Sequence, residues 1–215
     1  MTASSLPWLR RVRVARSATT PSAYHARTMR IAMVASECEP WAKTGGLADV
    51  VDALSRALGT PQPAGPGHEV DVYLPFYRGL NPPRHLVPLE LRVPVGGPAG
   101  VARHETVTLW SGEADGYRLR LVEHQPSFDR DSYYMDGTSD YVDNPARFTL
   151  LGRAVLEAIR AEARPVDVIH GHDWQAGPAL LSLKLRYRGD PLLAGAATML
   201  TCHNLAYHGW TANQD

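Results

Sequence analysis

A lysine and two glycines stand just ahead of an expected helix near the amino-terminal end of this 215-residue chain. In the run Lys43-Thr44-Gly45-Gly46, the glycines would let a ligand approach the backbone closely, and the helix start would offer free N–H groups to an anion. The lysine adds a positive charge that suits a phosphate. The spacing therefore predicts an anion-binding loop, and the alternative is an ordinary glycine turn beside a surface lysine.

Two histidine-bearing segments follow later strands of the expected sheet. They are His170-Gly171-His172-Asp173-Trp174-Gln175 and His203-Asn204. Ligands bind outside the carboxyl ends of strands in doubly wound sheets, so we expect His172 and Asp173 to face a ligand cleft and His203 and Asn204 to lie on its rim. The alternatives are that Asp173 caps the next helix while Trp174 packs, and that Asn204 makes a turn.

A third polar segment, Tyr141-Val142-Asp143-Asn144-Pro145, precedes a long helical periodicity. An Asp or Asn at the N-cap with a proline in the first turn is a common helix start. That interpretation explains Asp143 and Asn144 without any function. The functional interpretation places both of them on the wall of the cleft.

Strands and helices that alternate along the chain must position these segments. Apolar runs predict strands and a 3.6-residue periodicity predicts helices. Strands are expected at Arg30–Ser36, Glu69–Leu74, Val166–Ile169 and Ala197–Thr201, and helices at Leu47–Leu58, Pro145–Ala163 and Ala176–Arg186. Leu86–Val93, His104–Trp110 and Tyr117–Val122 alternate in polarity, which predicts an inserted antiparallel β segment. The fold class is therefore α/β, with a mostly parallel sheet.

Composition narrows the function classes. Lys plus Arg and Asp plus Glu each number 22, and no apolar run reaches the roughly 18 residues of a membrane span. Beyond residue 30 acids outnumber bases, so we expect neither nucleic-acid binding nor a membrane partner. Cys38 and Cys202 are the only cysteines, which excludes a disulfide framework and favours a reducing, cytoplasmic setting.

The first 28 residues have a different composition from the rest, because they are rich in arginine and contain no acid. We expect a disordered basic extension that is not part of the fold. It would come from a start codon placed before a true start at Met29, or it would be a transit peptide, or otherwise a disordered tail. Only a transit peptide would place the protein in a plastid.

Several segments together resemble bacterial glycogen synthase and the wider group of starch and glycogen synthases that use ADP-glucose. They are Lys43–Val50 in the setting of Ala35-Ser36-Glu37, Gly67-His68-Glu69-Val70, His172-Asp173-Trp174, and His203-Asn204-Leu205-Ala206-Tyr207. The resemblance runs from Arg30 to the last residue. It implies the GT-B architecture, in which two Rossmann-like halves face each other across a cleft. Residues 29–215 would form the N-terminal half, and the C-terminal GT-B domain would be missing.

The resemblance also implies roles for residues. Lys43 would contact the donor diphosphate, and Gly45 and Gly46 would let the loop close on the sugar phosphate. Catalytic roles fall to His172 and Asp143, and the remaining substrate-binding positions are Asn144, Asp173, Trp174, His203 and Asn204. His172 would hydrogen-bond the glucose or stabilise the developing cation through its main-chain carbonyl. The partners would be ADP-glucose and an α-1,4-glucan, with retention of anomeric configuration, no metal and no separate cofactor.

Two other functions remain open on the sequence. The chain could be a truncated, non-catalytic fragment that at most binds glucan, because one wall alone cannot clamp ADP. Alternatively, His170, His172, Asp173 and His203 could be the ligands of a metal-dependent hydrolase.

Overall fold

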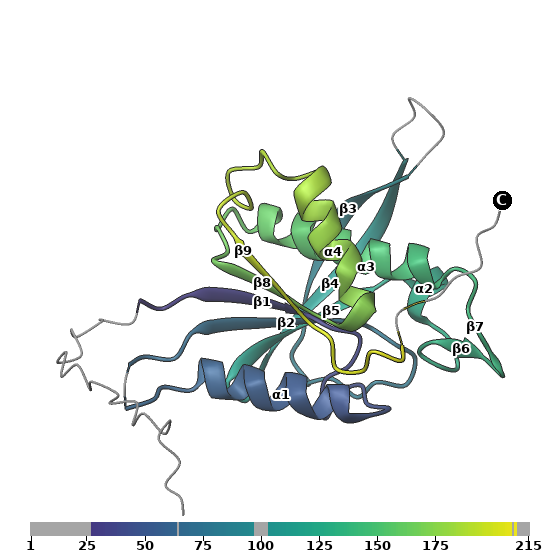
Figure 1. Ribbon diagram of the computed structural model, residues 1–215, viewed down its shortest axis with the longest axis horizontal. Coiled ribbons are helices and arrows are strands. Elements are labelled where there is room, and N and C mark those ends of the chain that lie inside the picture. Colours follow the sequence, from purple (N-terminus) through teal and green to yellow (C-terminus); the bar gives the residue numbers. More distant parts are fainter. Residues whose placement is uncertain (1–26, 64, 97–102, 208, 210–215) are drawn as a thin grey trace, which may run out of the picture.

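A computed structural model describes residues 27–63, 65–96, 103–207 and 209 (Figure 1). The expected extension over residues 1–28 lies almost wholly outside the described residues, which begin at Arg27. The helices are α1 (Gly46–Gly59), α2 (Gln125–Phe128), α3 (Asn144–Ala161) and α4 (Asp173–Leu185). The strands are β1 (Arg30–Val34), β2 (Glu69–Pro75), β3 (Val87–Val95), β4 (Arg103–Ala114), β5 (Tyr117–Glu123), β6 (Met135–Asp136), β7 (Ser139–Asp140), β8 (Val168–His172) and β9 (Ala197–Thr201).

One sheet organises the molecule. Seven strands lie in the order β3-β4-β5-β2-β1-β8-β9, and β5, β2, β1, β8 and β9 all run parallel. This confirms the predicted α/β class with a mostly parallel, Rossmann-like sheet. The predicted antiparallel segment is confirmed as well, since β4 pairs antiparallel with both β3 and β5. It extends the main sheet at one edge, because β5 also pairs with β2.

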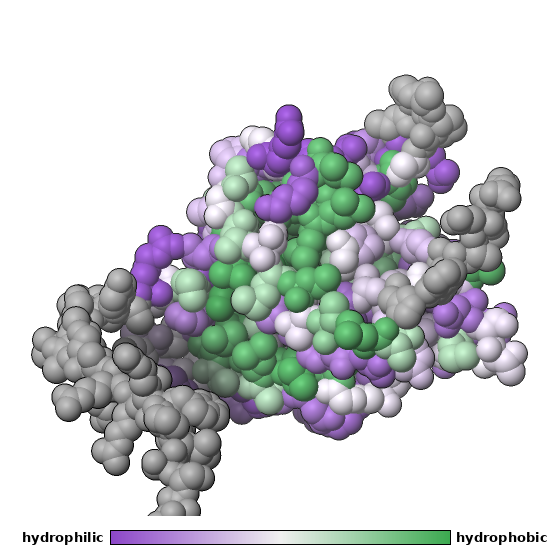
Figure 2. All heavy atoms as spheres, viewed as in Figure 1, coloured by the Kyte–Doolittle hydropathy of each residue, from purple (hydrophilic) through white to green (hydrophobic). Residues whose placement is uncertain are grey.

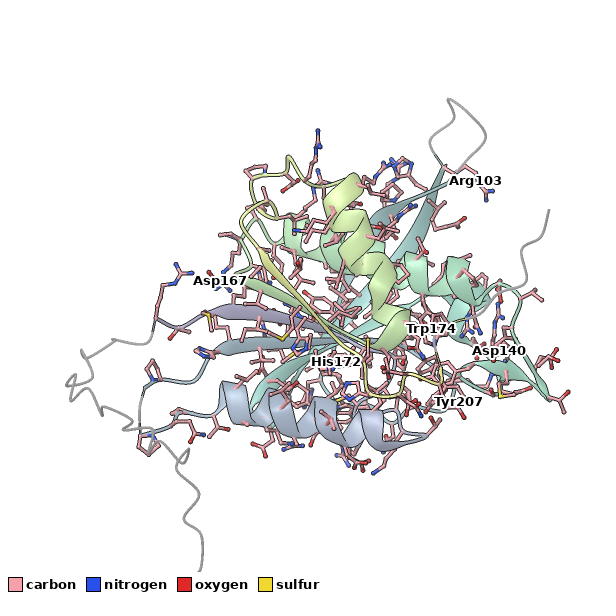
Figure 3. The ribbon with its side chains drawn as sticks, in the orientation of Figure 1. Arg103, Asp140, Asp167, His172, Trp174 and Tyr207 are labelled. Atoms are coloured by element: carbon pink, nitrogen blue, oxygen red, sulfur yellow. The ribbon has the colours of Figure 1, made fainter. Side chains whose placement is uncertain are left out.

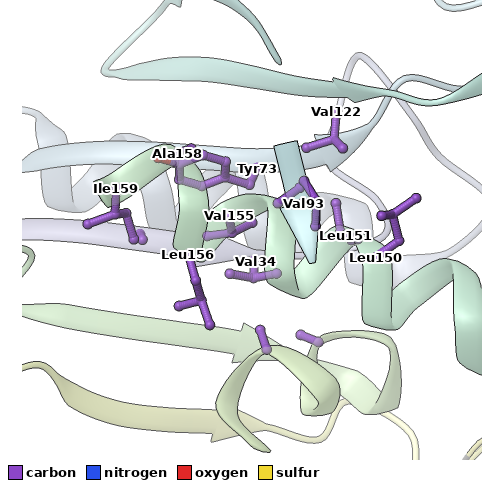
Figure 4. Packing of buried hydrophobic residues seen from close by; sticks show 14 of the residues in the cluster. Val34, Tyr73, Val93, Val122, Leu150, Leu151, Val155, Leu156, Ala158 and Ile159 are labelled. Atoms are coloured by element: carbon purple, nitrogen blue, oxygen red, sulfur yellow. The ribbon is translucent and has the colours of Figure 1, made fainter. Parts of the chain in front are cut away.

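Helices cover both faces of the sheet, α1 on one side and α3 with α4 on the other (Figure 1). Alternate residues of β1 explain how this is possible. Ile31 and Met33 belong to the core under α1, whereas Ala32 and Val34 belong to the core under α3 and α4. Figure 4 shows the core under α3 and α4, in which the apolar face of α3 packs on the sheet. Because both faces are covered, the central strands are apolar runs rather than alternating patterns.

A glycine sets the distance between the two helices on that face. A Cβ at Gly152 of α3 would lie 2.6 Å from the backbone nitrogen of Ala179 on α4. Backbone cannot move aside as a flexible side chain can, so only glycine permits this contact. The close packing fixes α4 against α3 and thereby fixes the residues at the start of α4.

Several boundaries differ from those predicted, and two of them bear on the candidate site residues. The strand expected at Val166–Ile169 is β8, which continues to His172, and the helix expected from Ala176 begins at Asp173. His170, Gly171 and His172 therefore lie within the strand rather than after it. The reason is tertiary, because β8 pairs with β1 on one side and with β9 on the other, and these ladders extend the strand through polar residues.

The surface in the view of Figure 2 shows apolar side chains gathered over α4 and β9. Leu181 and Leu185 of α4 and Met199 and Leu200 of β9 are exposed. Among the described residues, no helix has the length and apolar character needed to cross a membrane.

Candidate functional site

The predicted site segments meet at the carboxyl edge of the parallel strands. β1, β8 and β9 are neighbours in the sheet and run in the same direction. The lysine-glycine loop follows β1, His172 ends β8, and His203 follows β9. Figure 3 shows His172 and Trp174 at the start of α4, on the same side of the molecule as Tyr207. Segments that lie 160 residues apart in the chain thus form one edge.

Three histidines stack at this edge. The rings of His170 and His172 lie 4.2 Å apart, and those of His172 and His203 lie 5.2 Å apart. The His172 Nδ1 is 2.9 Å from the His203 Nε2. The His172 side chain is fully buried, and among the described residues its Nε2 has no hydrogen-bond partner. One polar atom of the buried ring is therefore unused by the protein.

Burial decides the charge of this histidine. Burial, together with the smaller effects of the neighbouring His170 and His203, lowers the pKa of His172 to about 3. The imidazole is consequently neutral at physiological pH. A neutral ring can accept or donate a hydrogen bond, but it cannot act as a cation.

Asp173 joins the ends of β8 and β9. Its φ of 58° is in the left-handed region, where a short polar residue is tolerated better than a branched one. Its carboxylate accepts the backbone N–H of His203 at 2.6 Å. The alternative in which Asp173 caps the helix is wrong, because His172 is the N-cap residue and Asp173 contacts the neighbouring loop instead.

The lysine-glycine loop lies open. Lys43 is 44% exposed, and its ammonium contacts Asp49 at 2.6 Å and Glu39 at 2.8 Å. Hydrogen bonds to Asp49 and Glu39 raise the pKa of Lys43, so it stays charged. A Cβ at Gly45 or at Gly46 would meet no atom within 4 Å. These glycines are thus not required by packing inside the described chain, and the backbone is accessible from outside.

Glu37 holds this loop and was not predicted as a site residue. Its carboxylate is only 3% exposed. It accepts the backbone N–H of Thr44 at 2.5 Å, the Thr44 hydroxyl at 2.7 Å and the Gly45 N–H at 3.2 Å. The Glu37 carboxylate therefore occupies the position in which the N–H groups of Thr44 and Gly45 would otherwise hold an anion. The loop conformation depends on Glu37, which leaves Lys43 as the exposed cation.

Tyr134, also missed from the sequence, connects the loop to the rest of the edge. Its hydroxyl donates to Glu37 at 2.6 Å, and its ring lies 6.2 Å from Phe148 of α3. Phe148 in turn packs edge-to-face on Trp174 at 5.2 Å. Trp174 therefore packs as the alternative interpretation expected, and this aromatic row links the loop after β1 to the start of α4.

The segment before α3 has a largely structural role. Asn144 is 1% exposed; its amide donates to the Tyr134 carbonyl at 2.9 Å and accepts from Arg147 at 2.6 Å. Asp143 is the N-cap residue of α3, and it forms a two-point ion pair with Arg130. The hydrogen bond from Arg130 lowers the pKa of Asp143, so this carboxyl is ionised. Asn204 is exposed, and it accepts the N–H of Ala206 at 2.9 Å, as a turn residue does.

The histidines do not converge as metal ligands would. The rings stack instead of pointing at one centre, and His170 Nε2 lies 2.8 Å from the hydroxyl of Thr201. Over the described ranges, no three His, Cys, Asp or Glu side chains form a group that could hold a metal ion. The hydrolase alternative therefore has no geometric basis there.

A family model described as the starch synthase catalytic domain matches residues 30–215. The chain is 37% identical over 186 residues to glycogen synthase 1 of Geobacter sulfurreducens, and 41% identical over 185 residues to glycogen synthase 2 of Geobacter metallireducens. Each match covers 84% of this chain, but only 35% and 36% of those relatives. The chain thus spans about a third of the length of the curated proteins that it matches.

A solved structure shares the fold. It is the catalytic domain of starch synthase IV from Arabidopsis thaliana bound to ADP and acarbose. The TM-score is 0.70 at 28% sequence identity, and the match covers 84% of this chain and 35% of that one.

Proposed function

Since the chain belongs to the family of starch synthase catalytic domains, we propose that it forms the N-terminal half of a GT-B glucosyltransferase. The reaction moves glucose from ADP-glucose to the non-reducing end of an α-1,4-glucan, with retention of anomeric configuration. The observation that carries this proposal is the meeting of the Lys43 loop, His172 and Trp174, and His203 at one sheet edge. The neighbour bound to ADP and acarbose supports a nucleotide and an oligosaccharide as ligands.

Lys43 is the residue proposed to contact the donor diphosphate. Cleavage of the bond between glucose and phosphate builds negative charge on the departing ADP, so a nearby ammonium stabilises the transition state more than the ground state. Because Lys43 is exposed, its side chain can turn toward a ligand. It would then lose its contacts with two exposed carboxylates, those of Glu39 and Asp49. Exposed ion pairs of this kind are worth only about 0–1 kcal/mol. The cost of redirecting Lys43 is therefore small.

His172 and Asp143 have different proposed roles. The neutral His172 ring has one unused nitrogen and can hydrogen-bond a glucose hydroxyl once the edge opens slightly. Its main-chain carbonyl can face positive charge on the sugar. Asp143 is held ionised by Arg130, which suits electrostatic stabilisation and excludes a role as general acid. We assign neither residue as a covalent nucleophile.

ADP-glucose is a substrate, and the reaction needs no separate cofactor. A second Rossmann-like domain would face this edge and hold most of the nucleotide. We place the protein in the cytoplasm, the setting that its cysteine usage favours.

A chimera tests the proposal. Residues 30–215 replace the matching segment of glycogen synthase 1 of Geobacter sulfurreducens, and labelled glucose is followed from ADP-glucose into glycogen. We expect turnover of roughly 1 per second or more in the folded chimera. We expect little or no transfer by the 215-residue chain alone, because transfer requires both substrates to be held in alignment.

The controls are the unmodified relative and an α-specific glucan hydrolase that digests the product. A folded chimera without transfer, beside an active parent, would contradict the proposed function. Enzyme-like transfer by the chain alone would instead contradict the need for the second domain.

A further inference from the structure

A concavity of about 630 Å³ lies at the far end of α4 from the candidate site. It is bounded by β3 and β4, the end of α3, and the turn after α4. Its charged and imidazole side chains are those of Arg92, His104, Glu157, Arg160, Arg186 and Asp190, which we call the basic pocket. Small-molecule sites commonly have volumes of roughly 300–1,000 Å³. The proposed glucosyl transfer uses none of these residues.

The two carboxylates of the basic pocket are already engaged. Arg160 contacts Glu157 at 2.6 Å through Nη1 and Asp190 at 2.7 Å through Nε. The Tyr187 hydroxyl also donates to Glu157, at 2.7 Å. These contacts balance Arg160 and fix the two carboxylates in place. Each carboxylate still has lone pairs that could accept a hydroxyl from a ligand.

Arg92, Arg186 and His104 are the donors that remain. All three are exposed, and none of them has a carboxylate partner among the described residues. Burial raises the pKa of Tyr187, and the nearby Arg186 opposes that rise only weakly. A charge that the protein does not compensate is available to an external anion.

The sheet register brings two of these donors together. Arg92 pairs with Thr106, and Pro94 pairs with His104. Arg92 and His104 are thus diagonal neighbours on one face of the β3–β4 ladder. Residues in such a diagonal pair are separated by roughly 7–8 Å. Arg186 approaches from the turn after α4. Donors from three separate elements therefore line one cavity.

We propose that the basic pocket binds a small-molecule phosphate monoester. Guanidinium groups recognise phosphate oxygens through charge-assisted, two-point hydrogen bonds, which suits Arg92 and Arg186. The hydroxyls of the ester's carbon skeleton would meet Glu157 and Asp190. The pocket is larger than a bare phosphate ion requires, and this favours an ester over inorganic phosphate.

Calorimetric titration of the 215-residue chain tests this inference with ribose 5-phosphate, inorganic phosphate and ribose as probes. We expect ribose 5-phosphate to bind with a Kd near or below about 1 mM, inorganic phosphate to bind more weakly, and ribose not to bind measurably. Equal binding of inorganic phosphate and the ester would overturn the ester assignment. Absence of ribose 5-phosphate binding, or equal binding of ribose, would overturn the site.

Variants locate the binding. Arg92→Gln combined with Arg186→Gln should weaken ribose 5-phosphate binding at least about tenfold, since each removes a charge-assisted contact. Arg188→Gln is the matched control, because Arg188 is exposed on the same turn and does not line the pocket; its Kd should stay within about twofold. Circular dichroism checks that each variant is folded, and Arg186→Gln alone serves if the double variant is not. Unchanged binding in the folded variants, or an equal loss in Arg188→Gln, would overturn the proposal.

Discussion

At the amino ends of the parallel strands a cluster of charged side chains is buried in mutual ion pairs, whereas at the carboxyl ends Lys43 makes its ion pairs on the surface. Asp71 of β2 is 1% exposed and accepts two hydrogen bonds from Arg118 at 2.8 Å each. Arg30 and Arg120 contact both Asp71 and Glu162. At the other edge, Lys43 pairs with the exposed carboxylates of Glu39 and Asp49, and the His172 Nε2 has no hydrogen-bond partner within the described part of the chain.

The difference indicates that one end of the sheet stabilises the fold and that the other end is available for ligand binding. A buried, mutually paired cluster has no room for a ligand, so its charges serve the fold. An exposed group with weak partners, such as Lys43, can exchange those partners for a substrate at little cost. The contrast also explains why the pKa of Asp71 stays low. Burial alone would raise it, but Arg120 and Arg118 outweigh burial and keep this carboxylate ionised.

The largest expected effect is on the buried cluster. Asp71→Asn removes the carboxylate that pairs with Arg118 and leaves Arg30 and Arg120 with Glu162, and breaking a buried pair costs roughly 3–5 kcal/mol. Urea unfolding followed by circular dichroism measures the free energy of unfolding. Glu69→Gln is the matched control on the same strand, because Glu69 pairs with Arg164 at 2.7 Å on the surface. Glu69→Gln should lower the free energy of unfolding by no more than about 1 kcal/mol. Equal losses in Asp71→Asn and Glu69→Gln would contradict the contrast between the two edges.

A smaller, pH-dependent effect is expected from His172. Its pKa is about 3 in the folded chain and roughly 6.5 in an unfolded chain. The unfolded state therefore binds a proton that the folded state refuses, so stability is complete above about pH 6.5 and declines as the pH falls toward 3. The slope reaches about 1.4 kcal/mol per pH unit.

His172→Gln should flatten this decline between pH 6.5 and 4.5, as measured by urea unfolding at several pH values. The exposed His85 provides the control variant His85→Gln, which should leave the decline unchanged. His170, whose pKa burial also lowers, would keep part of the slope. If His172→Gln and the parent declined in parallel, the His172 ring would not be neutral in the fold.

The smallest effect concerns the hydroxyl that supports the loop. Tyr134→Phe removes one of the hydrogen bonds to Glu37 and should cost about 1 kcal/mol of stability. In the chimera it should also raise KM for ADP-glucose, by less than about tenfold. The control variant Tyr187→Phe removes a similar tyrosine–carboxylate hydrogen bond, the one to Glu157, far from the loop. It should cost similar stability and leave KM unchanged, so an equal rise in KM would show that Tyr134 has no particular link to the loop.

Sequence patterns predicted most of the fold, because the central strands are apolar runs and the helices have a clear periodicity. They failed where tertiary pairing overrides polarity, as in β8, which its neighbours extend through His170 and His172. They also failed for Glu37 and Tyr134. Their contact joins residues 97 positions apart, and no local pattern marks either residue as a partner of the other. The motifs selected candidate residues that range from the exposed Lys43 to the fully buried His172, and only the fold revealed which other residues support them.

The most direct test of this account is kcat/KM for ADP-glucose in the chimera carrying Lys43→Gln, compared with Lys184→Gln. These are the only two lysines in the chain, and both are exposed. We predict a loss of about 30- to 1,000-fold for Lys43→Gln, with unchanged free energy of unfolding, and about the parent value for Lys184→Gln. Near-normal kinetics in Lys43→Gln would contradict the account, since Lys43 would then be a surface lysine beside an ordinary glycine turn.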